Sequence, residues 1–295
     1  MNGRTAAARR AQGVGCFLLA LAGFAAYDAF AKHMVAVHPP ALVNLGRYVA
    51  VCSMALAVLL RHGQWRLWRA PHQRLLLARS LMLGVVATCF MTALVTMPLA
   101  EATAIYFTAP LLMVALSPWM LGEPVRRAEW AAVWLGFAGM LCIVRPGGSL
   151  PWTGTTLMAV AAVCYALFQL LTRRLSGRVP APVQFSYMAV VCLAVTSLPM
   201  LFGPLPPWPG AAAFGLLVAG GFVSGAAQLL LLAAFRRAEL ATLAPLNYLQ
   251  LLMAVMISAW WFGRTPDGPA LAGIGLIALA GVWLARARHL PAPQT

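Results

Sequence analysis

Charged side chains are scarce in this chain, and acidic ones are the scarcest. Only 9% of its 295 residues are Asp, Glu, Lys or Arg, and only six of these are acidic. A soluble domain normally has roughly a quarter of its residues charged, whereas 62% of this chain is hydrophobic. The composition therefore excludes an ordinary soluble protein and predicts a chain that lies mostly in lipid.

The motifs of common metal, phosphate and hydrolytic sites are also missing. The sequence has no CxxC pair, HExxH, GxSxG or phosphate-binding loop, and its five histidines form no cluster. An intramembrane enzyme for lipid or isoprenoid substrates would need clustered carboxylates, and the six acidic residues are scattered. We therefore expect no enzymatic activity, no metal and no cofactor. The six cysteines lie in apolar stretches and are expected to be free thiols: Cys16, Cys52, Cys89, Cys142, Cys164 and Cys192.

The net charge of +15 raises the question of nucleic-acid binding. Most basic residues here flank apolar stretches, and no basic run alternates with exposed aromatic residues, as it does in proteins that bind single strands. Membrane insertion explains this pattern better. We expect the lipid bilayer as a partner and no nucleic acid.

Long apolar runs separated by proline and glycine turns make up most of the sequence. Lipid requires every backbone amide to be hydrogen-bonded within its own segment or a closed barrel, and these non-alternating runs favour helices. The fold class predicted is an all-α integral membrane protein with ten transmembrane helices. The predicted spans are residues 14–36, 41–60, 77–97, 100–121, 129–145, 152–173, 182–201, 211–235, 239–262 and 269–286.

The basic residues alternate between the two sides of this layout. Seventeen lie in the N-terminal tail, in every second loop, at span ends or in the C-terminal tail, and the other loops hold only Arg145 and Arg264. The seventeen are Arg4, Arg9, Arg10, Arg61, Arg66, Arg69, Arg74, Arg79, Arg126, Arg127, Arg173, Arg174, Arg178, Arg236, Arg237, Arg286 and Arg288. Because positive loops stay inside, both termini are expected in the cytoplasm.

A weak internal repeat runs through the chain. A shift of about 140 residues places 41–52 over 181–192, and 111–113 over 251–253. The predicted organisation is a cytoplasmic tail 1–13, a first repeat 14–145, a second repeat 152–286 and a cytoplasmic tail 287–295. Because each repeat has five spans, the second enters the membrane from the opposite side, giving two inverted-topology five-helix repeats. Secondary transporters built this way bind substrate near the midplane, at the repeat interface.

Three charged residues lie well inside the predicted spans: Asp28, Lys32 and Arg47. A charge at mid-membrane depth costs roughly 2.5–3.5 kcal/mol on insertion scales, so their presence needs a reason. Asp28 and Lys32 share a helix face, and Asp28 and Arg47 are expected about 12 and 9 Å from the outer ends of their helices. One interpretation is structural, with Asp28 paired to Lys32 or Arg47 while Lys32 extends outward. The other is a cavity in which Arg47 binds a carboxylate and Asp28 receives an amine or a proton.

Further polar and aromatic residues are candidates for lining the substrate path. Buried amides in helix bundles often serve only as interhelical hydrogen bonds, so each has a structural alternative. The candidates are Tyr27, Asn44, Tyr165, Gln184, Asn247 and Gln250.

Glu101 and Glu239 open the fourth and ninth spans at matching repeat positions. A carboxylate stabilises a helix N-terminus, so a structural role is expected for both, with gating or proton relay as the alternative. Pro110 and Pro245 are candidate hinges within the same two spans, because proline removes a helical hydrogen bond.

Several stretches resemble the EamA family of the drug/metabolite transporter superfamily. They are residues 98–105, 109–112, 121–124, 136–139, 172–175 and 238–246. The second repeat departs at Gly263-Arg264-Thr265, where the first has Gly122-Glu123-Pro124. The resemblance implies a bacterial inner-membrane protein of ten helices in two inverted repeats. It also implies a small-molecule substrate, with export the commoner direction; family members move amino acids, opine-type chelators, riboflavin or S-adenosylmethionine.

The reading favoured by the sequence is a secondary transporter that works by alternating access. The charged trio favours an amino-acid-like or carboxylate-bearing compound, and the resemblance implies export and includes opine-type metallophores among the cargoes. Protons are the candidate coupling ion, with the substrate gradient as the alternative driving force. The alternatives are an uptake transporter for riboflavin or S-adenosylmethionine, and a membrane scaffold subunit that does not transport. The sequence leaves the oligomeric state open between a monomer and a homodimer.

Overall fold

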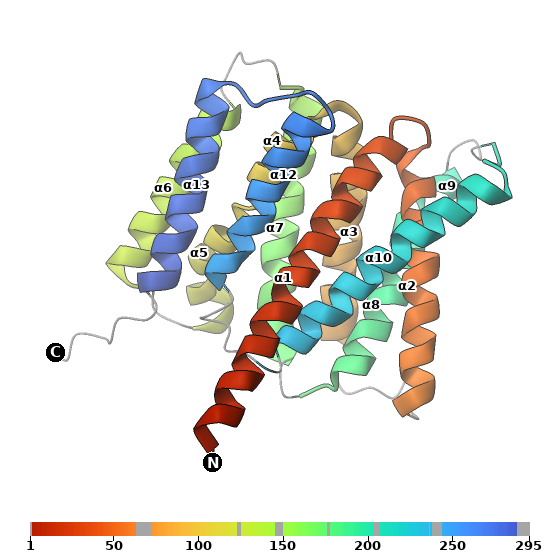
Figure 1. Cartoon of the computed structure of the whole chain (residues 1–295), viewed down its shortest axis with the longest axis horizontal. Coiled ribbons are helices and arrows are strands. Elements are labelled where there is room, and N and C mark those ends of the chain that lie inside the picture. The colour runs from red at the N-terminus through yellow and green to blue at the C-terminus, as the bar shows by residue number, and fades with distance from the viewer. Residues whose placement is uncertain are drawn as a thin grey trace. The chain divides into compact units, whose positions relative to one another are not determined.

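The computed structural model describes residues 2–62, 72–122, 125–144, 150–175, 178–202, 207–235, 237 and 244–287. Within these ranges the chain forms helices and turns and no β-strand, in agreement with the predicted all-α class. The α-helices, labelled in Figure 1, are α1 (Asn2–Met34), α2 (Pro40–His62), α3 (Gln73–Thr96), α4 (Leu99–Tyr106), α5 (Ala109–Leu121), α6 (Arg127–Val144), α7 (Trp152–Leu175), α8 (Ala181–Ser197), α9 (Pro199–Phe202), α10 (Ala211–Phe235), α12 (Tyr248–Trp260) and α13 (Gly268–Ala287). A short 3₁₀ helix, η2 (Ala244–Asn247), precedes α12.

Eight apolar stretches in the described ranges are long enough to cross a membrane, and each coincides with one of the first eight predicted spans. Two shorter apolar helices, Tyr248–Trp260 and Gly268–Leu284, fall on the last two. The predicted ninth span begins at residue 239, and residues 238–243 lie outside the described ranges. The chain is thus a multi-pass membrane protein, and the count of ten spans stays a prediction.

The fourth predicted span is interrupted, which corrects the expectation of one continuous helix over 100–121. Helix α4 ends at Tyr106 and α5 begins at Ala109. Pro110 has no N–H to donate to the preceding turn and lies in the first turn of α5, where proline is tolerated. The N–H of Thr108 bonds instead to the carbonyl of Ile105 at 3.1 Å. The matching Pro245 lies in η2, just before α12 begins.

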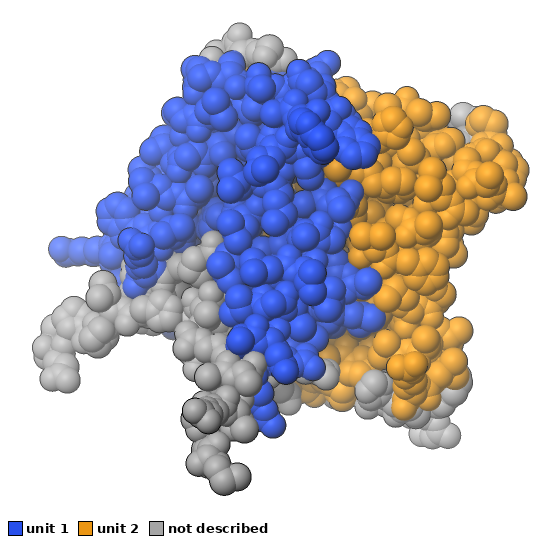
Figure 2. All heavy atoms as spheres, in the orientation of Figure 1, with its two compact units in different colours: residues 1–26, 98–150, 226–295 blue, residues 27–97, 151–225 orange. Residues whose placement is uncertain are grey.

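Two compact units make up the structure, coloured separately in Figure 2. Unit 1 comprises residues 1–26, 98–150 and 226–295, and unit 2 comprises residues 27–97 and 151–225. Helices α1 and α10 contribute residues to both units. Each unit combines segments from both predicted repeats.

In unit 2, α3 packs along α7 and α8, and α2 packs along α8. The contacts give the relative directions of these helices. Arg79 and Met97, near the two ends of α3, meet Thr172 and Gly154 of α7 in reverse order, so α3 and α7 are antiparallel.

The small residues of α10 give its direction along α2. A Cβ added at Gly225 would lie 2.5 Å from the Met54 sulfur, and Gly46 lies against Leu217. Residue numbers rise together along the two helices, which are therefore parallel.

One pair of contacts in unit 2 recurs under the repeat shift. Gly84 of α3 packs against Val195 of α8, and Gly225 of α10 packs against Met54 of α2. Residues 84 and 225 are 141 positions apart, as are residues 54 and 195. Glycine at both positions allows close helix approach. The same packing therefore occurs twice, each time between a helix of one repeat and a helix of the other.

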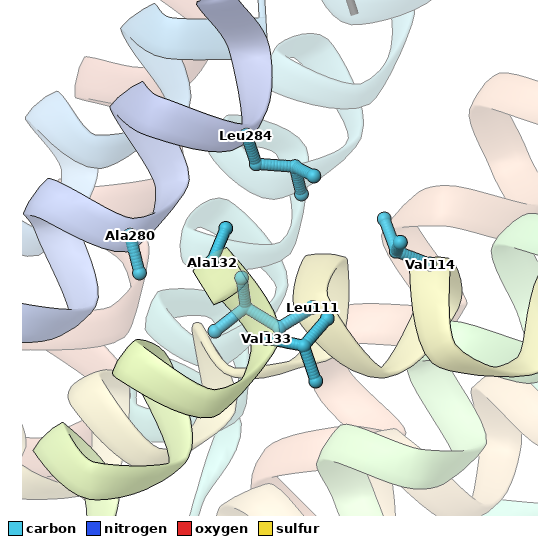
Figure 3. Close-up of a cluster of buried hydrophobic side chains, with 6 residues drawn as sticks. All are labelled: Leu111, Val114, Ala132, Val133, Ala280 and Leu284. Carbon is cyan, nitrogen blue, oxygen red and sulfur yellow. The ribbon is translucent and has the colours of Figure 1, made fainter. Parts of the chain in front are cut away.

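In unit 1, α6 and α13 lie side by side (Figure 1). Gly139 faces Ile277 and Gly136 faces Ala280, so residue numbers run in opposite directions and the helices are antiparallel. A Cβ at Gly139 would lie 2.7 Å from the carbonyl oxygen of Gly273, so a larger residue would separate the backbones. Figure 3 shows the core that α5, α6 and α13 bury together, formed by Leu111, Val114, Ala132, Val133, Ala280 and Leu284.

Candidate functional site

Lys32 of α1 binds the C-terminal end of α3. Its ammonium donates hydrogen bonds to the backbone carbonyls of Leu94 at 2.6 Å and Met97 at 2.8 Å. These carbonyls belong to the last turn of α3, where the helix itself offers no donors. A lysine ammonium at a helix C-terminus also interacts favourably with the negative end of the helix dipole. Lys32 therefore has a structural contact, and a part in substrate binding stays a prediction.

Arg47 of α2 lies against aromatic rings. Its guanidinium carbon is 4.6 Å from the centre of the Tyr27 ring and 5.4 Å from that of Tyr48. The Asp28 carboxylate is near enough to act electrostatically on the guanidinium. The structure thus brings Tyr27, Asp28 and Arg47 together within unit 2.

Two buried polar atoms at Arg47 and Tyr27 have no hydrogen bond of regular geometry among the described residues, although the guanidinium and the Tyr27 hydroxyl lie close enough to interact. The Nε of Arg47 and the hydroxyl oxygen of Tyr27 are both buried, and neither has a hydrogen-bond partner in the described part of the chain. Tyr27 as a whole is only 1% exposed. Buried polar atoms of this kind are uncommon in folded proteins and call for a specific explanation. A bound polar ligand would supply one.

Asn44 lies one turn before Arg47 on α2 and is 1% exposed. Its Nδ2 donates to the carbonyl of Ala87 in α3 at 3.2 Å, which joins α2 to α3. Its Oδ1 is buried and has no hydrogen-bond partner among the described residues. Asn44 therefore has an interhelical role and one acceptor left unused.

Two further candidates, Tyr165 and Gln184, belong to unit 2. Tyr165 stacks on Phe168 with ring centres 5.7 Å apart, and its hydroxyl accepts a hydrogen bond from Gln169 at 3.2 Å. The Nε2 of Gln184 donates to the carbonyl of Val179 at 2.9 Å, in the turn before α8. This turn contact gives Gln184 a local structural role.

Arg79 is a buried cation that the sequence analysis grouped with the membrane-flanking arginines, and the structure corrects this. Helix α3 begins at Gln73, earlier than the predicted 77, so Arg79 lies in its second turn and is 4% exposed. Its Nε donates to the Thr172 hydroxyl at 2.6 Å, and its guanidinium carbon lies 4.4 Å from the centre of the Phe168 ring. Leu76, three positions earlier on the same face, is fully buried and could have indicated this orientation.

Within unit 2, Arg79 and Lys32 lie at opposite ends of α3. Arg79 lies near the start of α3, and Lys32 binds carbonyls at its end. Fifteen residues separate Arg79 from Leu94, or about 22 Å along a helix. The unit therefore holds cationic side chains at both ends of α3.

The remaining candidates belong to unit 1 or lie outside the described ranges. Glu101 is in the first turn of α4 and lines a pocket formed by residues of unit 1. Asn247 and Gln250 flank the start of α12 and are half-buried. Tyr248 beside them packs on Phe107, with ring centres 6.0 Å apart. Glu239 lies outside the described residues.

Within the described residues, none of these candidate sites is a metal-ligand cluster or a disulfide. Within the described ranges, no three His, Cys, Asp or Glu side chains gather as metal ligands would. All six cysteines are free thiols, as predicted. The polar chemistry of the described residues therefore lies in charged, amide and aromatic side chains.

Curated relatives share most of their length with this chain. A protein named riboflavin transporter from Rhizobium johnstonii is 27% identical over 233 residues, which are 79% of this chain and 74% of that protein. Pseudopaline exporter CntI from Pseudomonas aeruginosa is 26% identical over 94% of this chain and 96% of its own. A protein named S-adenosylmethionine uptake transporter from Rickettsia felis is 24% identical over 92% of each chain. These relatives are transporters, not enzymes.

The fold also matches a solved crystal structure. The TM-score is 0.67, with 21% sequence identity, over 95% of this chain and 99% of the other. The sequence profile of the EamA-like transporter family matches residues 11–145 and again residues 152–286. Together these ranges cover nearly the whole sequence in two successive copies. The chain belongs to the EamA-like transporter family.

Proposed function

We propose that this protein is a secondary transporter that exports a small amino-acid-like or carboxylate-bearing metabolite, opine-type metallophores included, by alternating access. The observation that carries the proposal is Arg47, a half-buried cation within a membrane helix whose Nε is buried and has no hydrogen-bond partner among the described residues. An ionised side chain inside a membrane span is costly unless it is paired. A carboxylate is the natural ligand because its two oxygens match the planar guanidinium.

The neighbours of Arg47 support a zwitterionic substrate. Asp28 carries the opposite charge and acts electrostatically on Arg47, so a carboxylate and an amine on one ligand would each have a partner. Lys32 is already bonded to the end of α3, which leaves Arg47 as the carboxylate ligand. Pseudopaline exporter CntI, similar over 94% of this chain, supports a cargo of this class.

Uptake is the second candidate function, and the aromatic residues favour it. Tyr165 is half-buried and its ring stacks on the buried Phe168 in unit 2, so Tyr165 is the ring that could stack with a flat heteroaromatic ligand. Relatives named riboflavin transporter and S-adenosylmethionine uptake transporter support this direction and this cargo. In this reading the aromatic residues recognise the substrate and the charges are structural.

The proposed setting is the bacterial inner membrane, with ten spans in two inverted repeats and both termini in the cytoplasm. The alternation of basic loops supports this orientation. The antiparallel pairs α3/α7 and α6/α13 and the parallel pair α2/α10 are the directions that such a layout requires. Protons are the proposed coupling ion.

Thermal-shift measurements on the detergent-purified chain test the substrate class. Amino acids, opine-type chelators, riboflavin and S-adenosylmethionine are added one at a time, because a ligand that binds only the folded state raises the melting temperature. We expect stabilisation by a carboxylate-bearing amino-acid derivative in the wild type and in Arg74→Gln, an exposed-arginine control. We expect none in Arg47→Gln. Stabilisation by riboflavin alone, retained in Arg47→Gln, would favour uptake and aromatic recognition. If proteoliposomes moved no compound that binds, the scaffold alternative would be favoured.

A further inference from the structure

A pocket of about 310 Å³ lies in unit 1, where α4 begins and α6 ends. Pro98 and Glu101 line it from the start of α4, and Ile143 lines it from the end of α6. Arg264 and Asp267, from the segment between α12 and α13, complete its charged lining. The predicted topology places these helix ends on the outer side of the membrane.

Glu101 lines this pocket and has one carboxylate oxygen without a hydrogen-bond partner among the described residues. The residue is only 9% exposed, and its Oε2 is buried with no hydrogen-bond partner among the described residues. Glu129 of α6, 7% exposed, differs because its Oε2 accepts a hydrogen bond from the N–H of Arg126 at 2.8 Å. Glu101 also interacts with its own backbone N–H at the start of α4, but its Oε2 has no partner among the described residues. A buried carboxylate oxygen of this kind needs another source of positive charge.

Among the described residues that line the pocket, the charges leave room for one more cation. Arg264 and Asp267 both act electrostatically on Glu101. With both carboxylates ionised, the three lining charges sum to minus one. Asp267 is already engaged at α13, where its Oδ1 accepts a hydrogen bond from the N–H of Ala270 at 3.0 Å. One proton or one monovalent cation at Glu101 would make this lining neutral.

The segment that carries Arg264 is held in place by the end of α12. The Arg264 N–H donates to the carbonyl of Ser258 at 2.9 Å, and the Ser258 hydroxyl donates to the carbonyl of Arg264 at 3.0 Å. Ser258 is itself buried. The backbone of Arg264, the cationic residue of the pocket lining, is therefore fixed by a reciprocal pair of hydrogen bonds.

We propose that the Glu101 pocket binds one positive charge, a proton or a monovalent metal cation, and that this is the coupling-ion site of the transporter. The coupling role rests on the proposed function of secondary transport. The binding itself is a property of unit 1 and needs no substrate. Proton and metal cation share one chemistry here, the neutralisation of a buried carboxylate.

Carbodiimide labelling of the purified full-length chain tests the binding directly. A protonated carboxyl adds across a C=N bond of dicyclohexylcarbodiimide, its proton going to nitrogen and its oxygen to the central carbon. The adduct rearranges to an N-acylurea that peptide mass spectrometry locates. We expect labelling at Glu101 that falls as the pH rises. If the ligand is Na⁺ or K⁺, its chloride salt protects Glu101 at constant pH, while choline chloride at equal ionic strength does not.

Matched variants give the sign of the electrostatic effect. Arg264→Gln removes a positive neighbour, so labelling should persist to a higher pH. Asp267→Asn removes a negative neighbour, so labelling should end at a lower pH. Glu129, buried but hydrogen-bonded, is the internal control for access of the reagent. The proposal is overturned if Glu101 is labelled no more than Glu129, or if neither pH, Na⁺ nor K⁺ changes its labelling.

Transport measurements separate this proposal from the proposed function. In Glu101→Gln, substrate binding in the thermal-shift assay should persist, and transport should lose its dependence on the cation gradient. Transport that stays intact and gradient-dependent in Glu101→Gln would overturn the Glu101 site and leave the transporter standing. Labelling as expected with no compound transported would overturn the proposed function and leave the cation site standing.

Discussion

The guanidinium carbon of Arg47 lies 4.6 Å from the centre of the Tyr27 ring. A cation held over an aromatic face gains a favourable electrostatic interaction without using its N–H donors. The ring therefore positions the guanidinium while its Nε has no hydrogen-bond partner in the described part of the chain. This arrangement suits a residue that binds and releases an anion.

Replacing Arg47 should weaken substrate binding more than it weakens the fold. We expect Arg47→Gln to reduce the affinity for a carboxylate-bearing ligand by about 10- to 100-fold, the equivalent of about 1.5–3 kcal/mol for a charged hydrogen bond. Arg47→Lys should recover part of this loss, because it keeps the charge but not the planar pair of donors. Titration of the stabilising ligand in the thermal-shift assay measures both. Equal affinities in wild type and Arg47→Gln would contradict the assignment.

Lys32 should contribute to stability and not to substrate affinity. Lys32→Met removes two hydrogen bonds from a charged donor to the last turn of α3, and we expect a loss of about 2 kcal/mol in unfolding free energy. His33→Gln, at the exposed neighbouring position, should change stability little. Chemical unfolding in detergent gives the difference. If Lys32→Met unfolds like the wild type but no longer binds ligand, Lys32 belongs to the substrate site.

The sequence predicted the helices well because apolar length is a strong local signal. The span predicted at 152–173 is found as Trp152–Leu175, and the fourth span breaks just before Pro110. A hinge role for Pro110 stays a prediction. The contacts between side chains depend on how each helix is rotated and on which helices are its neighbours. The weak apolar periodicity of these helices defines neither. The carbonyl partners of Lys32 were for this reason not predicted. Arg79 was assigned to the flanking set because α3 begins four residues earlier than predicted.

Removing the acceptor of the Arg79–Thr172 hydrogen bond should cost more stability than removing the buried cation. Thr172→Val removes the acceptor of the 2.6 Å bond and leaves a buried cation less satisfied, so we expect a loss of about 1–3 kcal/mol. Arg79→Met removes the charge itself and fills a similar space against Phe168, so its cost should be smaller, or stability should rise. Thermal unfolding of the two single variants and the double variant tests this. A double variant as unstable as Thr172→Val alone would contradict it.

Gly221 should tolerate no side chain, because it lies against the backbone of α2. A Cβ at this position would be 2.7 Å from the Cα and 2.8 Å from the carbonyl oxygen of Arg47, and neither atom can move without shifting the helix. We therefore expect Gly221→Ala to cost about 1–3 kcal/mol of stability by overpacking. Because the strain falls on the backbone that carries Arg47, ligand affinity should fall as well.

Gly215→Ala on the same helix is the matched control, since no atom lies within 4 Å of its added Cβ. Alanine there should be neutral or slightly stabilising, as in any exposed helix. Melting temperatures and ligand titrations of the two variants decide the matter, and equal behaviour of Gly221→Ala and Gly215→Ala would rule out the close approach of α10 to α2.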